Sequence, residues 1–262
     1  MSTFVLIHGA YHGGWCWDKV TPLLANKGHS VFAPDLPSHG KDPMDAEAVT
    51  LDDYMARVGV ILSQTQGPAI LVGHSLGGIT ITQAGENYTG LISKLVYLTA
   101  FIPGNNQSRF EMDNDVEEES LAGRYRIYSD DKKTMVMDDA GIKPAFYADC
   151  DDKTIAWVKE RLCPQATSIA KTRVQTSDAR WGSIPRAYIE CTGDKAIPIA
   201  QQRACWAKHP CHPVITMETS HSPFMSSPVA LADQTGIWIY KYSRRPKALN
   251  QARSTICKIP SS

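Results

Sequence analysis

The sequence from Ala69 to Gly78 reads AILVGHSLGG, an apolar run followed by a serine that has a glycine two positions away on each side. Residues 77–88 continue in a helical pattern, which predicts that Ser75 lies on a sharp turn between a strand and a helix. Glycine at positions 73 and 77 leaves out side chains that would collide with the neighbouring strand and helix. Such a turn exposes the serine hydroxyl at the carboxyl end of the strand and directs the helix N-terminus at it. We therefore interpret Ser75 as a nucleophile rather than as part of a chance glycine-rich turn.

Short apolar runs and longer helical patterns alternate along the chain on both sides of this turn. The apolar runs lie at Phe4–His8, Val31–Ala33, Ala69–Gly73, Leu95–Thr99, Ala187–Thr192 and Val214–Glu218. Helices are expected near Trp15–Lys27, Leu51–Gln64, Gly77–Tyr88, Ala200–Lys208 and Pro228–Tyr242. Because the runs are apolar on both faces, they suit a parallel sheet that helices cover on each side. The pattern predicts an α/β fold with a doubly wound, mostly parallel sheet of about six strands.

One long stretch between two of the expected strands does not follow this alternation. It contains an acidic cluster at residues 111–119, groups of aromatic residues, and helical patterns near Met137–Tyr147 and Asp151–Leu162. Since both ends of the stretch join strands of the same sheet, we interpret it as an inserted helical cap whose acidic cluster is a solvated face. The expected domains are a core of residues 1–102 and 185–242, a cap of residues 103–184, and a basic, disordered tail of residues 243–262.

The composition argues against several kinds of partner. Lys and Arg together number 27, as do Asp and Glu, so no overall basic field attracts nucleic acid or a membrane surface. No apolar run reaches the roughly 18 residues of a membrane span, and no signal peptide is visible, which makes a cytoplasmic location the default expectation. The seven cysteines show no C-x-x-C spacing, so we expect free thiols. No metal-ligand cluster or nucleotide-binding motif is visible either, so neither a metal nor a cofactor is expected.

A serine hydroxyl needs a base within hydrogen-bond reach, and that base needs a third group to hold it. In folds of this kind the chain order is serine, then an acid, then a histidine. Asp194 follows the expected strand Ala187–Thr192, and His221 follows the expected strand Val214–Glu218. An aspartate in such a loop is often only a turn former or a helix cap, but the order favours Asp194 as the acid that orients His221. The histidines that fit this order less well are His8, His12, His29, His39, His74, His209 and His212.

The negative charge that develops on a substrate oxygen needs preorganised hydrogen-bond donors. The backbone N–H of Leu76, directly after the expected nucleophile, is one candidate. The turn after the first strand, HGAYHGG at residues 8–14, supplies the other, for which the Ala10 N–H is the strongest candidate. A phosphate-binding loop is the alternative for this turn, but it lacks both G-x-G-x-x-G spacing and a following G-K-[ST].

Taken together, these motifs resemble the methylesterase and hydroxynitrile lyase family of α/β-hydrolases, which includes plant methylesterases and bacterial carboxylesterases. The resemblance is carried by FVLIHGA at residues 4–10, HGGW at residues 12–15, Trp17, GHSLGG at residues 73–78 and YIECTGDKAIP at residues 188–198. It covers about residues 3–240, although the cap matches poorly. The resemblance implies the α/β-hydrolase fold, a triad of Ser75, Asp194 and His221, and oxyanion donors at Ala10 and Leu76.

Three positions separate the esterases of this family from its lyases. The resemblance implies that a lyase has threonine at the position of Gly9, Glu-Ser-Cys at residues 74–76, and lysine at the position of Ser222. The threonine helps to hold a cyanohydrin, and the charge of the lysine stabilises the departing cyanide. This chain has none of these residues apart from the serine itself, which favours an esterase.

These observations predict a serine carboxylesterase that hydrolyses small to medium uncharged carboxylic esters through an acyl-enzyme. The alternatives that stay open are a hydroxynitrile lyase or lactonase on the same fold, and a non-catalytic protein that binds a small ligand. The expected partner is a small-molecule ester, with no nucleic acid and no membrane, and the chain is expected to be a monomer or a homodimer.

Overall fold

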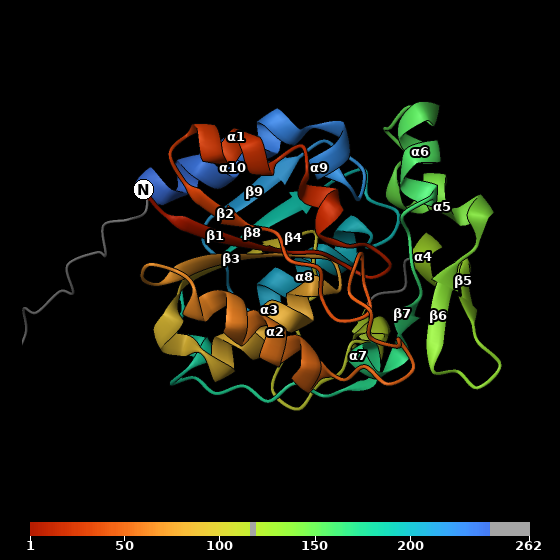
Figure 1. Ribbon diagram of the computed structural model, residues 1–262, viewed down its shortest axis with the longest axis horizontal. Coiled ribbons are helices and arrows are strands. Elements are labelled where there is room, and N and C mark those ends of the chain that lie inside the picture. The colour runs from red at the N-terminus through yellow and green to blue at the C-terminus, as the bar shows by residue number, and fades with distance from the viewer. Residues whose placement is uncertain (116–118, 242–262) are drawn as a thin grey trace, which may run out of the picture.

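The computed structural model describes residues 1–115 and 119–241. A six-stranded sheet runs through the described residues in the order β2-β1-β3-β4-β8-β9, and every neighbouring pair of its strands is parallel (Figure 1). The strands are β1 (Thr3–Ile7), β2 (Ser30–Phe32), β3 (Ala69–His74), β4 (Ile92–Leu98), β8 (Arg186–Cys191) and β9 (Val214–Met217). Each strand overlaps the apolar run expected for it, which confirms the predicted fold class.

The direction in which strands are added changes at β1, because β2 lies on one side of it and β3 on the other. The pairs Val5–Leu71 and Ile7–Gly73 set the register between β1 and β3. In an open parallel sheet, the loops that leave the carboxyl ends of two strands at such a point diverge and leave a crevice between them. The loops at this crevice are those that contain Ala10 and Ser75.

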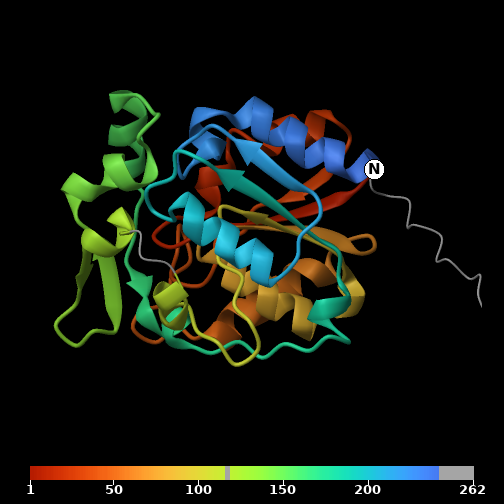
Figure 2. The ribbon, with the colours of Figure 1, turned by 180° about the vertical axis from the view of Figure 1, so that it is seen from behind.

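Helices cover both faces of the sheet. Two of them, α1 (Thr21–Asn26) and α10 (Pro228–Lys241), lie on one face, and α2 (Leu51–Ser63), α3 (Gly77–Asn87) and α8 (Ile199–Lys208) lie on the other (Figures 1 and 2). Helix α2 begins at a capping box, in which the Thr50 hydroxyl accepts from the Asp53 N–H and the Asp53 carboxylate accepts from the Thr50 N–H. Short segments of the core include the 3-10 turn Thr89–Leu91 and α9 (Pro223–Ser226).

One helix expected from the sequence, Trp15–Lys27, is divided in the structure. Gly14–Trp17 forms a short 3-10 turn, and α1 begins only at Thr21. Pro22 explains the division, because proline lacks an N–H and is accommodated without strain only in the first turn of a helix.

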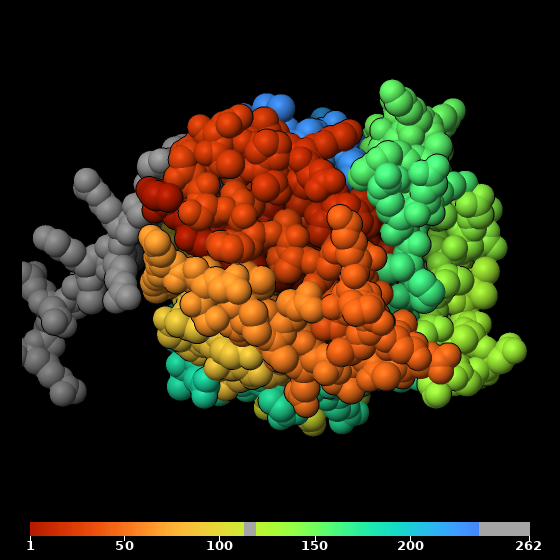
Figure 3. Space-filling model, in the orientation of Figure 1, coloured from red at the N-terminus to blue at the C-terminus, as the bar shows by residue number. Residues whose placement is uncertain are grey.

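Most of the described part of residues 103–184 lies at the end of the molecule where the carboxyl ends of the sheet strands meet, and its last part, residues 175–183, returns along α3 to the start of β8 (Figures 1 and 3). Its helical elements are the 3-10 segment Phe110–Asp115, α4 (Leu121–Arg124), α5 (Asp139–Phe146), α6 (Asp152–Lys159), α7 (Thr167–Lys171) and the 3-10 turn Trp181–Ser183. It also contains an antiparallel sheet of β5 (Arg126–Tyr128), β6 (Thr134–Met137) and β7 (Gln165–Ala166), which the sequence analysis did not predict.

The hydrophobic core fills both sides of the six-stranded sheet, and its largest fully buried side chains include Trp17, Tyr97, Tyr188 and Phe224. No helix among the described residues combines the length and the apolar character that crossing a bilayer requires. The tail expected at residues 243–262 lies outside the described residues.

Candidate active site

Ser75 lies on the turn between β3 and α3 with a φ angle of 53°. This value is in the left-handed region, which residues other than glycine adopt at a cost of about 1–3 kcal/mol. The glycines on either side leave room for the turn: a Cβ on Gly77 would lie 2.6 Å from the His8 carbonyl oxygen, and a Cβ on Gly73 would lie 2.7 Å from the Gly77 carbonyl oxygen. The close packing of β1, β3 and α3 therefore requires both glycines, as their spacing around the serine predicted.

Backbone hydrogen bonds hold this strained turn against β4. The Ser75 N–H donates to the Leu98 carbonyl oxygen at 3.2 Å. The Ser75 carbonyl oxygen accepts from the Gly78 N–H at 3.1 Å and from the Phe101 N–H at 3.2 Å. A rigid element therefore presents the serine, which keeps its hydroxyl in a defined position.

Asp194 and His221 follow β8 and β9, the two strands beyond β4 in the sheet. His221 Nδ1 and Asp194 Oδ2 are 2.6 Å apart, and both residues are almost fully buried. Because a carboxylate only accepts, the proton of the imidazole lies on Nδ1, and Nε2 keeps the lone pair with which it can take a proton. The carboxylate is itself held, since Oδ1 accepts from the N–H groups of Ala196 (2.7 Å) and Ile197 (2.9 Å) and Oδ2 accepts from the Thr99 hydroxyl.

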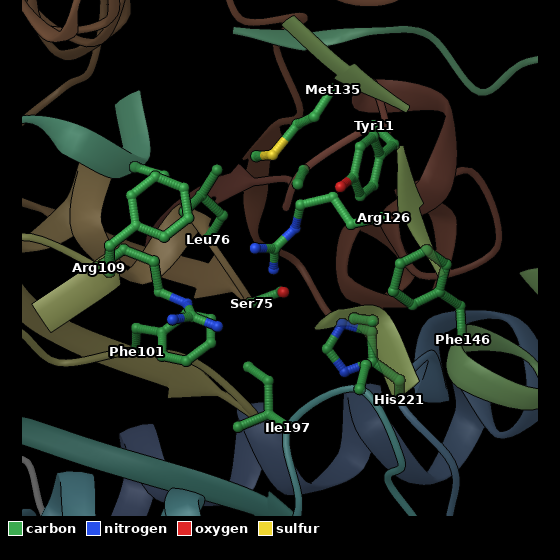
Figure 4. Close-up of a pocket in the computed structure, with 15 residues that line it drawn as sticks. Tyr11, Ser75, Leu76, Phe101, Arg109, Arg126, Met135, Phe146, Ile197 and His221 are labelled. Atoms are coloured by element: carbon green, nitrogen blue, oxygen red, sulfur yellow. The ribbon is translucent and has the colours of Figure 1, made fainter. Parts of the chain in front are cut away.

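The loop that carries His221 is fixed between the serine turn and the cap. His74 Nε2–H donates to the His221 carbonyl oxygen at 2.9 Å, and the centroids of the two rings are 4.5 Å apart. On the other side, the Asp149 carboxylate of the cap accepts from the Ser220 N–H at 2.8 Å and from the Ser220 hydroxyl. Ser75 and His221 line one pocket, and Figure 4 shows the hydroxyl and the imidazole facing the same space.

Ala10 and Leu76, the two expected oxyanion donors, line the same pocket as Ser75. Within the part of the chain that the structure describes, neither backbone N–H donates to a protein acceptor. Gly9 allows the two loops to approach, because a Cβ at this position would lie 2.8 Å from the Ser75 Cβ and 2.9 Å from His74 Nδ1. The arrangement leaves two backbone donors for an oxygen atom bound next to Ser75.

Three further histidines near the site stay neutral because they are buried. Burial lowers the pKa of His12 to about 3, and it lowers the pKa values of His8 and His74 well below the ordinary value. His12 Nδ1–H donates to the Ala10 carbonyl oxygen at 2.6 Å, and His12 Nε2 accepts from the Tyr147 hydroxyl of the cap. His12 therefore supports the backbone of the expected oxyanion site without adding positive charge beside His221.

The pocket over Ser75 has a volume of about 50 Å³. Core residues that line it are Ala10, Tyr11, Ser75, Leu76, Phe101, Ala196, Ile197 and His221. Cap residues that line it are Arg109, Phe110, Ala122, Arg126, Met135, Phe146 and Ala170. Most of the wall is apolar, but the cap adds the guanidinium groups of Arg109 and Arg126 (Figure 4).

The structure thus brings together Ser75, His221, Ala10 and Leu76 at one pocket, with Asp194 behind His221. Four further residues of this region were not expected from the sequence: Thr99, Asp149, Arg109 and Arg126. Thr99 follows β4 at the same sheet edge, so the strand-end argument that pointed to Asp194 could also have found it. The three cap residues carry no local signal. Among the described residues, no three His, Cys, Asp or Glu side chains are grouped so as to hold a metal ion.

A parallel sheet that presents a serine on a strand–helix turn and a histidine–aspartate pair at the same edge defines the α/β-hydrolase class. The chain belongs to the alpha/beta hydrolase family, whose family model matches residues 4–234.

The relatives of the chain include esterases and a lyase. Methylesterase 1 from Arabidopsis thaliana is 33% identical over 244 residues, which cover 88% of this chain and 93% of that protein. Alpha-hydroxynitrile lyase from the same plant is 33% identical over 206 residues, which cover 74% of this chain and 80% of that protein. The crystal structure of a pyrethroid hydrolase from Sphingobium faniae JZ-2 matches with a TM-score of 0.82 at 28% identity, covering 92% of this chain and 98% of that one. These matches confirm the resemblance to the methylesterase and hydroxynitrile lyase family.

Proposed function

We propose that the protein is a serine carboxylesterase in which Ser75 is the nucleophile, His221 is the general base and Asp194 orients the base. The observation that carries the proposal is the buried hydrogen bond of 2.6 Å between His221 and Asp194, next to a pocket that also contains Ser75 on its strained turn. The similarity to a methylesterase and to a pyrethroid hydrolase supports ester hydrolysis as the reaction.

In the proposed reaction, His221 Nε2 takes the proton of the Ser75 hydroxyl while Oγ attacks the carbonyl carbon of the ester. The N–H groups of Ala10 and Leu76 stabilise the oxyanion of the tetrahedral intermediate. His221 then gives the proton to the departing alcohol, and a water molecule repeats both steps on the acyl-enzyme to release the acid. Asp194 keeps the imidazole in the required tautomer and stabilises its protonated form.

The volume of the pocket sets the size of the acyl group. About 50 Å³ holds only a few water molecules, since one water needs about 10–15 Å³ by a comparable measure. The proposed substrates are therefore small esters with short acyl chains, and long chains require the cap to move.

A lyase is the second candidate, because an alpha-hydroxynitrile lyase is among the relatives. The space around Gly9 argues against it, since the Cβ of a threonine at this position would come within 2.8 Å of the Ser75 Cβ. Ser222, which is fully buried, stands where the family resemblance puts the lysine of a lyase. The site therefore lacks both the hydroxyl and the charge that cyanohydrin cleavage would use.

A fluorophosphonate probe tests the nucleophile directly. We expect intact-protein mass spectrometry to find one added phosphonyl group on the wild-type chain and none on Ser75→Ala. With p-nitrophenyl esters, we expect the acetate and butyrate to be hydrolysed faster than the octanoate. A protein that only binds a ligand would stay unlabelled, and a labelled protein that releases cyanide from an aromatic cyanohydrin but hydrolyses no ester would be a lyase.

A further inference from the structure

The guanidinium groups of two cap residues, Arg109 and Arg126, line the pocket that contains Ser75. Arg109 is 5% exposed, and its guanidinium carbon lies 4.0 Å from the centroid of the Phe101 ring. Arg126 is the first residue of β5, and Figure 4 shows its guanidinium extending into the pocket towards Ser75, with the Tyr11 hydroxyl next to it. Arg126 therefore places a positive charge on the cap side of the space that would hold an ester.

Arg126, which is half-buried, has only neutral partners among the described residues. Its Nε is buried without a hydrogen-bond acceptor, its Nη1 lies 3.3 Å from the Tyr128 hydroxyl, and the Tyr11 phenol also interacts with the guanidinium. Among the described residues, the ionisable groups that act most on Arg126 are the phenols of Tyr11 and Tyr128, and no carboxylate makes an ion pair with it. A guanidinium has five N–H donors in a planar fork and keeps its charge at all ordinary pH values.

Tyr11 adds a neutral donor beside this charge. Burial raises the pKa of Tyr11 even though Arg126 and Arg109 lie close by, so the phenol keeps its proton. A charged group that is withdrawn from water without a counter-charge destabilises the fold. A bound anion would supply the missing counter-charge and would accept from both the guanidinium fork and the phenol.

We infer that the esters accepted by this site carry a carboxylate a few bonds from the scissile carbonyl, so that the substrate class is short half-esters of dicarboxylic acids. The inference rests on the proposed esterase function, and it replaces the uncharged ester expected from the sequence. The distance between the two groups of the substrate is limited because Ser75 and Arg126 line a space of only about 50 Å³. The carboxylate pairs with Arg126 in the fork geometry that planar carboxylates favour.

Monomethyl succinate illustrates the reaction. Ser75 Oγ bonds to the ester carbonyl carbon, the bond to the methoxy oxygen breaks, and the methanol leaves with the proton that His221 returns. Water then forms a bond to the same carbon while the bond to Ser75 Oγ breaks. The products are methanol and succinate, whose new carboxyl group releases one proton, and no other reactant takes part.

The test compares two methyl esters of the same shape and different charge. Monomethyl succinate carries a carboxylate where methyl 4-methylpentanoate carries an isopropyl group, and proton NMR follows the methanol released from either one. We expect kcat/KM of the wild-type chain to be about 10- to 100-fold higher for the succinate ester, since hydrogen bonds to charged groups contribute this much. In Arg126→Gln, we expect the ratio of the two kcat/KM values to fall at least tenfold.

Arg124→Gln is the matched control variant. Arg124 lies two residues before Arg126 and makes a surface ion pair with Glu119 at 2.7 Å, so its loss leaves the ratio unchanged. The inference would be overturned if the wild-type kcat/KM for monomethyl succinate were no higher than that for methyl 4-methylpentanoate. An equal loss on both esters in Arg126→Gln would also overturn it, because the guanidinium would then act on the reacting oxygen and not on the substrate carboxylate.

Binding to the Ser75→Ala variant separates this inference from the proposed function. Titration calorimetry measures the affinity of Ser75→Ala for monomethyl succinate without turnover, and adding Arg126→Gln should weaken that affinity at least tenfold. Failure of Ser75→Ala to bind the anionic ester would overturn the inference even if neutral esters are hydrolysed. A different outcome is a chain that binds monomethyl succinate through Arg126 but hydrolyses no ester and resists the fluorophosphonate probe. That outcome would support the anion site and overturn only the esterase proposal.

Discussion

The core and the cap contribute different kinds of residue to the same pocket. The core supplies Ser75, His221 and the two backbone N–H groups from loops at the carboxyl ends of the parallel strands β1, β3 and β9. The cap supplies apolar side chains and two arginines from short elements, such as β5 and the 3-10 segment Phe110–Asp115. The proposed reacting groups therefore belong to the core, and most groups that would face the rest of a substrate belong to the cap.

This difference teaches that one fold can keep its chemistry constant while its selectivity changes. If the division holds, substitutions in the core lower the turnover of every ester, and substitutions in the cap change the ratio between esters. A core variant that changes the ratio between esters, or a cap variant that lowers the turnover of every ester equally, would contradict this division of roles. Variants with smaller effects would show how completely the two roles are separated.

Loss of Ser75, the proposed nucleophile, should have the largest effect. Ser75→Ala removes the attacking oxygen and leaves binding and the oxyanion donors in place, so we expect kcat to fall on the order of 10⁵- to 10⁶-fold for all esters. The melting temperature should change little, because the substitution removes one oxygen atom from a partly exposed side chain. Steady-state kinetics and calorimetry check the two expectations, and residual turnover above about 1% in a purified sample would place the nucleophile elsewhere.

Loss of the orienting acid should come next. Asp194→Asn removes the acceptor that fixes the His221 tautomer, so we expect kcat to fall about 10⁴-fold. Thr99→Val removes one of the four donors to this carboxylate and should cost only about tenfold. Measuring kcat for both variants on one ester ranks them, and equal losses would show that Thr99 does more than hold Asp194.

Much of the core could be predicted because its signals are local. A buried strand shows as an apolar run, the serine turn shows as two glycines at fixed distances, and parallel strands bring their carboxyl ends to one edge. Asp194 and His221 follow from this edge and from the chain order. The division of the expected helix Trp15–Lys27 could also have been predicted, because Pro22 is visible in the sequence.

The cap could not be predicted to the same depth. Strand β7 has two residues, most of β5 is exposed, and β6 pairs with β7 about thirty residues further along the chain, so neither periodicity nor spacing marks this sheet. Arg126 had the appearance of an ordinary surface residue between Tyr125 and Ile127. Only the folding of β5 over the sheet edge turns its side chain into the pocket.

Acid should destabilise the core through its buried histidines. His8, His12 and His74 are neutral when folded because burial lowers their pKa values, to about 3 for His12, whereas an unfolded chain protonates each near pH 6.5. The unfolded state therefore binds more protons in this range, so stability is complete above about pH 6.5 and falls as the pH drops towards 3. Three groups together give a slope of up to about 4 kcal/mol per pH unit. Calorimetric unfolding at pH 5 in two buffers of different ionisation enthalpy should reveal uptake of at least three protons, because burial also lowers the pKa values of His29, His39 and His209. A result near zero would contradict the expectation.

The contact between Asp149 and Ser220 joins the cap to the loop of the proposed base, His221, so it tests whether the core alone positions the proposed reacting groups. Asp149→Ala removes the acceptor of the Ser220 N–H and hydroxyl, which frees the residue directly before His221. Because Asp149 is largely exposed and the loop keeps its bond to His74, we expect only about a five- to tenfold loss of kcat/KM. The loss should be the same for anionic and neutral esters, although the substituted residue lies in the cap. The rate of fluorophosphonate labelling measures the same effect, since it needs His221 but no substrate selection.

Asp151→Ala controls for damage to the cap, because Asp151 is an exposed aspartate two residues further on that caps α6 through the Thr154 N–H. This variant should lose about 1 kcal/mol of stability, as helix caps do, and keep its labelling rate. Asp149→Asn, which retains an acceptor oxygen, should lie between the wild-type chain and Asp149→Ala. If Asp149→Ala instead changes the ratio between anionic and neutral esters and leaves labelling intact, then Asp149 acts on the shape of the pocket. In that case the cap would select substrates without positioning the base. The roles of core and cap would then be more completely separated than the hydrogen bonds between Asp149 and Ser220 indicate.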